Sequence, residues 1–374
     1  MFADDAKEGG DRLPTRVPRR VQLNTGDSNL ASTKIVDIAS GSHHVLLLTE
    51  AGEVLSLGEG SKGQLGRIEA ADLDSIATKR ELFIVPGKVD FSKAVPSDSA
   101  APAPKIRRIF AGQWASFALS ESGTLYAWGL NNYFQLGFRT AAPVEMTNGN
   151  GNAADTSINC PALSLHAELF PAVVPTTTTT KTKSSSSNET STTTANNGGE
   201  NNNNNRENNN NNSSTENESI SMGEVVSVAV GQQHLTVLDS RGRVFTAGSV
   251  NYGKLGLGKA VLEKVGTEEA ALDTLTAIPE AAFGGDRVEA VVCGDFSAFA
   301  ITERGRLYGW GQGSAHIGTD VGEDAWEPRL MAGAYVEARE GGEGVRFISG
   351  SSGPQYGGWI GVIQEWAEET EKKA

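Results

Sequence analysis

Glycine recurs at fixed intervals along the chain, and this spacing constrains the fold more than any other feature. In GSHHVLLLTEAGEVLSLGEGSKGQLG (41–66), the glycines at 41, 52, 58 and 66 are separated by 11, 6 and 8 residues. The stretches 112–137 and 231–256 repeat these three intervals, and the stretch 294–318 repeats the first two and shortens the last to 7. Four copies of one spacing indicate four copies of one structural unit.

Each copy has the composition of short β-strands joined by tight turns. A helix would lose roughly 1 kcal/mol for every glycine compared with alanine. Glu50-Ala51-Gly52 is typical of a hairpin turn whose glycine takes a positive φ. An apolar run precedes each first glycine: IVDIAS (35–40), IRRIFA (106–111), VVSVAV (225–230) and VEAVVC (288–293). A weaker fifth copy begins at VRFISG (345–350) and ends in GGWIGVI (357–363).

The size of the unit favours one kind of repeat architecture. Each copy holds about four short β runs, which is the content of one propeller blade. Solenoid repeats are usually about 20 to 50 residues long, whereas most first glycines here are 56 to 71 residues apart. The sequence therefore predicts an all-β fold, a β-propeller with about five blades.

One spacing between first glycines, from 112 to 231, is much longer than the others. Residues 176–221 are rich in threonine, serine and asparagine and contain almost no apolar residue that could offset the entropy of ordering. We predict a disordered insertion between two blades, for which a solvated loop without function is the simplest interpretation. The predicted organisation is a connection at 1–34, blades at 35–175, the insertion at 176–221, blades at 222–363 and a charged tail at 364–374.

Composition excludes several classes of protein. The chain has 32 lysines and arginines against 46 aspartates and glutamates, a net charge of −14. Such a chain is a poor direct binder of nucleic acid, which requires clustered cations. Two cysteines, Cys160 and Cys293, provide no disulfide framework and fit a reducing compartment. Without a long apolar run or a secretory leader at the start of the sequence, we expect a soluble intracellular protein.

No catalytic or cofactor motif is present in the sequence. GEGSKGQLG lacks the Lys-Ser/Thr ending and the helix that a phosphate loop requires. His44 and His234 each stand three residues after a first glycine, so their recurrence belongs to the repeat before it belongs to a site. Histidines in different blades do not have the spacing of metal ligands. We expect no metal, no cofactor and no bond-making chemistry.

The repeat resembles that of the regulator of chromosome condensation family of β-propellers. The resemblance rests on A-x-G-x-x-H-x-x-x-L-x-x-x-G-x-V, on the closing G-x-L-G, and on the unrepeated GEDAWEP (322–328). It implies guanine-nucleotide exchange on the small GTPase Ran, by protein contact, in the nucleus at chromatin; the alternative location is the cytoplasm, if the family's basic N-terminal tail is absent. The family builds seven blades, and the five copies resemble its third to seventh, which indicates an incomplete chain that lacks the family's β-wedge and basic N-terminal tail.

The resemblance also implies which residues face the GTPase. The family uses residues that follow each first glycine. Carried over by motif, these are His43, His44, Gln113, Trp114, Gln233, His234, Asp295, Phe296, Gln355 and Tyr356, and Asn132 is expected to bind the GTPase as well. His43 stands where the family has an aspartate critical for exchange, and Tyr356 where it often has a histidine. The alternative for His44 and His234 is a structural role within the blade, and for Trp114 and Tyr356 it is packing between blades.

A second partner implied by the resemblance is the histone surface of chromatin. The loop 67–83 resembles the family's histone-contacting loop, and in it Lys79 and Arg80 are adjacent cations that could meet an acidic surface. Four acidic residues in the same loop favour the alternative, a solvated connection. For the whole chain, the alternative to an exchange factor is a non-catalytic propeller that acts as a scaffold.

Overall fold

The computed structural model describes residues 33–67, 85–94, 103–139, 163–169, 222–267, 270–313, 317, 323–331, 343–352 and 357–365. Of the strands at 163–169, 343–352 and 357–365, the backbone is described. The predicted insertion at 176–221 lies outside the described residues, and so do Lys79, Arg80, Gln355 and Tyr356. Expectations for these residues stay predictions.

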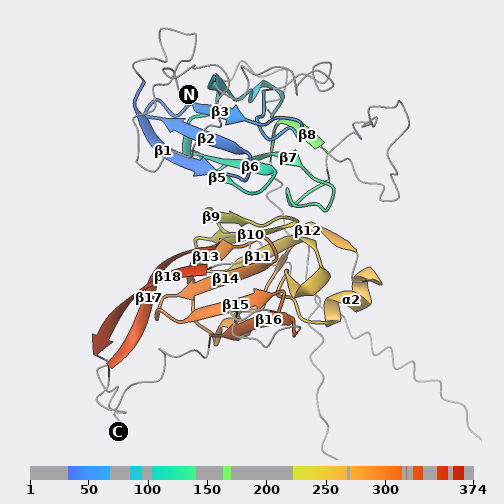
Figure 1. Ribbon diagram of the computed structural model, residues 1–374, viewed down its shortest axis with the longest axis vertical. Helices are drawn as coiled ribbons and strands as arrows, with labels where there is room; N and C mark the ends of the chain where they lie inside the picture. The colour runs from blue at the N-terminus through green and yellow to red at the C-terminus, as the bar shows by residue number, and fades with distance from the viewer. Residues whose placement is uncertain are drawn as a thin grey trace, which may run out of the picture.

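The described residues form successive antiparallel sheets, each made from neighbouring strands in chain order (Figure 1). The first sheet contains β1 (Ile35–Ser40), β2 (His44–Thr49), β3 (Val54–Gly58) and β4 (Gly87–Lys88). The second contains β5 (Ile106–Ala111), β6 (Ala115–Ser120), β7 (Leu125–Leu130) and β8 (Leu163–Leu169). These two sheets form the blue-to-green upper part of Figure 1.

The lower part of Figure 1 contains the remaining sheets. The third sheet contains β9 (Val225–Val230), β10 (His234–Asp239), β11 (Val244–Ser249) and β12 (Ala271–Ala277). The fourth contains β13 (Val288–Cys293), β14 (Ser297–Thr302), β15 (Leu307–Gly311) and β16 (Ala325–Leu330). The weak fifth copy forms a hairpin of β17 (Glu343–Ser352) and β18 (Gly357–Glu365). The all-β propeller fold expected from the repeat is confirmed.

Short helical segments interrupt this pattern in places where the sequence analysis expected none. They are η2 (Ser92–Ala94), η3 (Asn251–Gly253), α2 (Ala260–Val265) and η4 (Glu280–Phe283). The helix α2 is capped by Gly266, which has a φ of 86° and whose backbone amide donates to the Leu262 carbonyl. Within the described residues, no helix is long and apolar enough to cross a membrane.

A polar side chain closes the second hairpin turn of each four-stranded sheet. The Oγ1 atom of Thr49 accepts a bond of 3.0 Å from the Glu53 amide, and Gly52 between them has a φ of 80°. A side chain that accepts from the amide four residues later recurs at the matching position of the other three sheets, in Ser120, Asp239 and Thr302. The turn therefore requires a left-handed glycine and a short polar side chain together.

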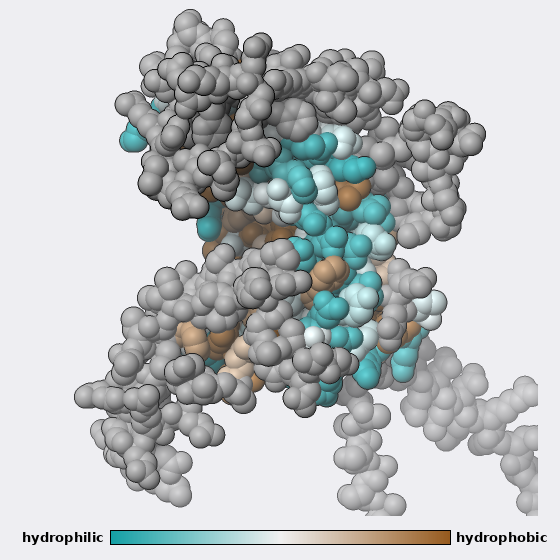
Figure 2. Space-filling view, viewed as in Figure 1, coloured by the Kyte–Doolittle hydropathy of each residue, from teal (hydrophilic) through white to brown (hydrophobic). Residues whose placement is uncertain are grey.

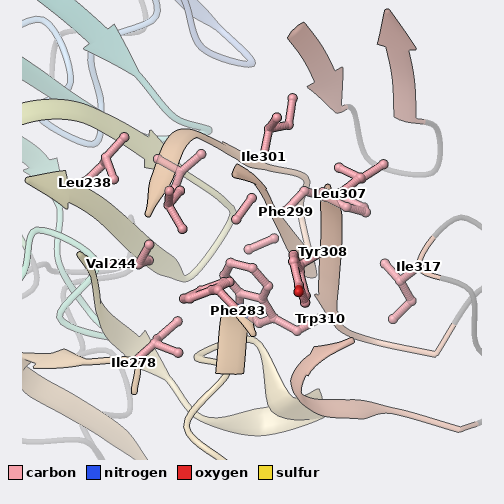
Figure 3. Close-up of a cluster of buried hydrophobic side chains, with 14 of the residues drawn as sticks. Leu238, Val244, Ile278, Phe283, Phe299, Ile301, Leu307, Tyr308, Trp310 and Ile317 are labelled. Atoms are coloured by element: carbon pink, nitrogen blue, oxygen red, sulfur yellow. The ribbon is translucent and has the colours of Figure 1, made fainter. Parts of the chain in front are cut away.

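The core lies between consecutive sheets, so the sheets stabilise one another. Every residue of β6, β10, β11 and β14 is buried. One apolar cluster joins Phe117 of the second sheet to Leu235 and Phe245 of the third. The next joins the third sheet to the fourth, and Figure 3 shows Leu238 and Val244 on one side of it and the rings of Phe283 and Trp310 within it. This is the stacking expected of propeller blades.

The first strand of the first sheet is less covered than its counterparts. Ile38 on β1 is 64% exposed, whereas Ile109 on β5, Val228 on β9 and Val291 on β13 stand at the same place in the repeat and are 4%, 5% and 7% exposed. In these three strands the preceding sheet covers the apolar side chain. Figure 2 shows apolar surface in the hollow between the upper and lower parts of the chain.

Candidate functional site

The turns that follow the first glycines lie at one end of their sheets, next to the loops that leave the third strands. Four backbone bonds join these turns to the last residue of a third strand or to the residue that follows it, with 2.8 to 2.9 Å between nitrogen and oxygen. In chain order the amide donors and carbonyl acceptors are Glu59 and His43, Leu130 and Trp114, Ser249 and Gln233, and Gln312 and Phe296. We call these turns and loops, residues 41–43, 59–66, 112–114, 131–137, 231–233, 250–256 and 294–296, the loop face.

Two close neighbours leave no room for a side chain at the first glycine of a copy. The ring of His44 and the Gly112 carbonyl of the next sheet occupy the space that a side chain at Gly41 would need. At Gly231, the ring of His234 and the carbonyl of Gly294 do the same. The glycine thus lets the histidine of its own copy and the backbone of the next sheet approach together. This is the physical reason for the recurring G-x-x-H.

His44 forms a buried bond between the first and second sheets. Its Nε2 atom lies 2.8 Å from Ser116 Oγ, which in turn donates to the Gln64 carbonyl at 2.9 Å. Since the serine proton is used there, His44 Nε2 is the donor in the bond to Ser116. Burial lowers the pKa of His44 to about 4, so the ring stays neutral at pH 7.

His234 lies deeper still. It is 0% exposed, and neither ring nitrogen forms a hydrogen bond to another side chain in the described structure. Burial, with a smaller contribution from the charge of Lys254, lowers the pKa of His234 to about 3. His44 and His234 therefore lie beneath the loop face. Their burial agrees with the structural alternative, and the direct contact that the resemblance implied stays a prediction.

His43 and Trp114 come together on the loop face from consecutive sheets. Their rings are stacked, with centroids 4.5 Å apart and planes 7° from parallel. His43 is exposed and Trp114 is half-buried. Gln113 beside them is half-buried, and its Oε1 atom has no hydrogen-bond partner in the described structure. Trp114 can therefore pack against the neighbouring sheet and still offer part of its ring to a partner.

The third and fourth sheets bring together the other expected residues. The Gln232 amide donates to the Asp295 carbonyl at 3.1 Å, which joins their two turns. Burial raises the pKa of Asp295 above its ordinary value. Phe296 is half-buried beside Asp295. Asn132 stands apart from this group, in the loop after β7, where its Oδ1 accepts from Gln135 Nε2 at 3.0 Å.

Two residues that were not singled out from the sequence lie where the turns of the third and fourth sheets meet, a place that we call the junction. Tyr252 is 39% exposed and packs edge-to-face on Phe296, with ring centroids 6.1 Å apart. Lys254 is fully buried, and its Nζ atom donates to Gln233 Oε1 at 2.9 Å. The available signal was a lysine in VNYGKLG at the position where GSKGQLG and NNYFQLG have glutamine.

The side chains on the loop face are suited to recognising a partner by contact. Within the described ranges, no three His, Cys, Asp or Glu side chains gather as metal ligands would. The face offers stacked aromatic rings, amide groups, the half-buried carboxylates of Glu59 and Asp295 and the buried ammonium group of Lys254. Its backbone is held by the four bonds described above. Loops on a rigid scaffold are a common place for protein contacts.

Comparisons with known proteins identify the same repeat that the glycine spacing indicates. The family model described as regulator of chromosome condensation (RCC1) repeat matches residues 106–135 and 288–316. The human regulator of chromosome condensation is 28% identical over 91% of this chain and 59% of its own length. The Xenopus laevis protein of the same name is 26% identical over 91% and 58%. The Arabidopsis thaliana ultraviolet-B receptor UVR8 is 24% identical over 90% and 66%.

Solved structures share the fold. Prp20p from Saccharomyces cerevisiae aligns with a TM-score of 0.56 and 19% identity, over 90% of this chain and 57% of that chain. Human WBSCR16 aligns with a TM-score of 0.51 and 19% identity, over 86% and 56%. The chain thus spans less than 60% of the length of these two structures and of the human regulator.

Proposed function

We propose that this chain, a β-propeller of RCC1 repeats, is a guanine-nucleotide exchange factor for a Ran-type small GTPase. It would act by contact alone, without a cofactor and without making or breaking bonds. An exchange factor accelerates nucleotide release because it binds the nucleotide-free GTPase more tightly than the loaded form. The requirement is a rigid surface that stabilises the nucleotide-free conformation.

The similarity to relatives supports this proposal. Regulators of chromosome condensation match over most of the chain. The crystal structure of Prp20p was described together with the binding of Prp20p to Gsp1p and histones. Gsp1 is a Ran GTPase. Because the chain spans little more than half the length of Prp20p, both partners are proposals here.

The observation that carries the proposal is the alignment of four repeat turns on one face. Their backbone is held by the four bonds between turns and loops, so little order would be lost on binding. We propose that the contact surface consists of His43, Gln113, Trp114, Asn132, Gln233, Asp295, Phe296 and Tyr356. His44 and His234 would support this surface from beneath, His44 through its bond to Ser116 and His234 through its packing on Gly231.

The test is release of a fluorescent GDP analogue from Ran in the presence of a small molar fraction of the chain. We expect release to accelerate in proportion to the concentration of the chain and excess GTP to complete exchange. Trp114→Ala removes the ring that stacks on His43 and should slow release. The matched control is Phe110→Ala, on the neighbouring strand β5 outside the loop face, with thermal melts for both variants.

A scaffold without exchange activity is the second candidate, and the exposure of Ile38 favours it. An edge strand with an uncovered apolar side chain, such as β1, can dock another repeat or another protein. The similarity to UVR8, a receptor, agrees with use of the fold for other purposes. Binding to nucleotide-free Ran without accelerated release would support the scaffold and contradict the exchange factor.

We propose chromatin as the location and histones as a further partner. The proposal rests on the relatives and on Lys79 and Arg80 of the sequence. Binding of the chain to reconstituted nucleosomes, compared with the Lys79→Ala/Arg80→Ala double variant, tests it. Equal binding by the two chains would remove these cations from the contact.

A further inference from the structure

Lys254 is a buried cation without an acidic partner. Its side chain is 0% exposed, and the bond of 2.9 Å from Nζ to Gln233 Oε1 is made to a neutral amide. Among the described residues, no carboxylate lies within 4.0 Å of the Lys254 Nζ atom. Burial lowers the pKa of Lys254 to about 8, so most of the protein carries this charge at pH 7. Burying an unpaired charge is costly.

The blade does not need a charge at this position. Gln64 and Gln135 occupy the same place in the first two copies, and both are buried. Each closes its own loop: Gln64 Oε1 accepts from the Lys62 amide at 2.9 Å, and Gln135 Oε1 from the Tyr133 amide at 2.8 Å. A neutral amide thus satisfies the loop. The lysine of the third copy carries a destabilising charge that the repeat can be built without.

Two aromatic rings cover the ammonium group. Nζ lies 5.3 Å from the ring centroid of Phe296 and 5.9 Å from that of Tyr252, at cation–π distances. Tyr252 has a φ of 59°, the left-handed region that a side chain makes unfavourable. Its counterpart in the second copy, Tyr133, is not among the residues with positive φ. Strain of this kind is often found at functional sites.

The other titratable groups at the junction leave one positive charge in the site. His234 lies below, and its low pKa keeps it neutral. Asp295, on the turn before β14, is half-buried and makes no ion pair with Lys254 within 4.0 Å in the described structure. A phosphate carries nearly two charges and needs several donors. A single ammonium group matches a single carboxylate.

We propose that Lys254 is the receptor for a carboxylate side chain of the partner GTPase, exposed when the ring of Tyr252 turns aside. Tyr252 is the part that can move, because its side chain is the exposed member of the cap. The cation–π contacts stabilise the ammonium group until the partner's carboxylate replaces them. The identity of the partner rests on the proposed function, whereas the receptor itself is a property of this chain.

The first experiment measures affinity for nucleotide-free Ran and the melting temperature of Lys254→Met. Methionine keeps the length of the side chain and removes the charge. We expect affinity to fall by about 30-fold or more, as for loss of one member of a buried charge pair, with a weaker dependence on salt. The melting temperature should stay equal or rise, because a buried unpaired charge is removed. Lys254→Gln, which copies Gln64 and Gln135, should behave in the same way.

The matched control is Lys259→Met, which removes the same charge from an exposed lysine outside the loop face. We expect its affinity to change by less than about 2-fold, because an exposed charge contributes little. Wild-type affinity for Lys254→Met, or an equal loss for Lys259→Met, would overturn the proposal. A loss of affinity that only follows a fall in melting temperature would also overturn it.

A second experiment does not depend on the GTPase. Sodium acetate is titrated into the chain against sodium chloride at equal ionic strength, and the ring signals of labelled Tyr252 are followed by NMR. We expect a saturable shift with acetate in the wild type that Lys254→Met abolishes. No saturable shift would overturn the carboxylate receptor. A shift without binding to Ran would instead contradict the proposed function and leave the receptor supported.

Discussion

The Nε2 atom of His44 lies 2.8 Å from the Oγ atom of Ser116, and this bond joins the first sheet to the second. Ser116 donates its own proton to the Gln64 carbonyl, which also accepts from Trp128 Nε1 at 3.0 Å. One buried carbonyl therefore ties a loop of the first sheet to two strands of the second. His44 therefore helps to hold the first sheet against the second.

This relationship predicts that His44→Ala lowers stability. The substitution leaves Ser116 Oγ without the His44 donor and opens a cavity beside Gly41, so we expect a loss of about 2 kcal/mol. Thermal melts of His44→Ala, Ser116→Ala and the double variant check it. In a double-mutant cycle the two losses should not add, because both variants break one bond. Additive losses would show that the bond contributes nothing.

The low pKa values of the buried histidines predict acid sensitivity. The pKa of His44 is about 4 in the folded chain, against a usual value of 6.5. Between these values the unfolded chain binds more protons, so stability is complete above pH 6.5 and falls as the pH drops toward 4. The full effect for His44 is about 3 kcal/mol.

The measurement is urea unfolding of the wild type and of His44→Gln at several values between pH 4 and 7. The variant should show a shallower loss of unfolding free energy with falling pH, since glutamine does not titrate. His234→Gln should do the same, because the pKa of His234 is also depressed, to about 3. Parallel curves for wild type and variants would mean that these rings become protonated in the folded chain at little cost.

The uncovered first strand predicts a contrast between two equivalent isoleucines. Ile109→Ala removes a side chain that packs on Leu46 and Leu48 and should cost about 2 to 4 kcal/mol. Ile38→Ala removes one that is 64% exposed and should cost less than about 0.5 kcal/mol. Urea unfolding of the two variants checks both values. Equal costs would mean that another surface covers Ile38 in solution.

The sheets were predictable because the glycine spacing reports turn geometry directly. Gly52, Gly123, Gly242 and Gly305 all have φ between 73° and 83°, which explains their fixed distance from the next strand. The polar residues that close these turns were not noticed, because Thr49, Ser120, Asp239 and Thr302 differ in type and share only hydrogen-bonding capacity. Recurrence of residue type is visible in a sequence, whereas recurrence of a contact is not.

The candidate site was predictable in part. Position after the first glycine correctly identified the turns, and His43, Trp114 and Phe296 lie in them. The position in the repeat did not separate exposed from buried residues. His43 and His44 are consecutive, but the strand β2 begins at His44, so the first side chain is exposed and the second is buried. Lys254 was missed because lysine is usually an exposed residue. Its burial depends on rings supplied by two different loops.

The position of His43 predicts that His43→Asp accelerates nucleotide exchange. The resemblance places an exchange-critical aspartate of the family at this residue, and His43 is exposed on the loop face, so the substitution does not disturb the core. The His43→Asp variant would lose the stacking on Trp114 and gain a charge that can meet a cation of the GTPase. We expect release of a fluorescent GDP analogue from Ran to accelerate by about 10-fold, the effect of about 1.4 kcal/mol.

Two further substitutions separate the charge from the loss of the ring. His43→Asn has nearly the shape of aspartate without its charge, and His43→Ala removes the ring alone. If the charge acts, His43→Asp is faster than both, and the difference shrinks as salt screens the attraction at an exposed site. If release depends instead on the ring stacked on Trp114, all three variants are slower than the wild type, and the loop face of this chain engages its partner through the His43 ring and not through a carboxylate.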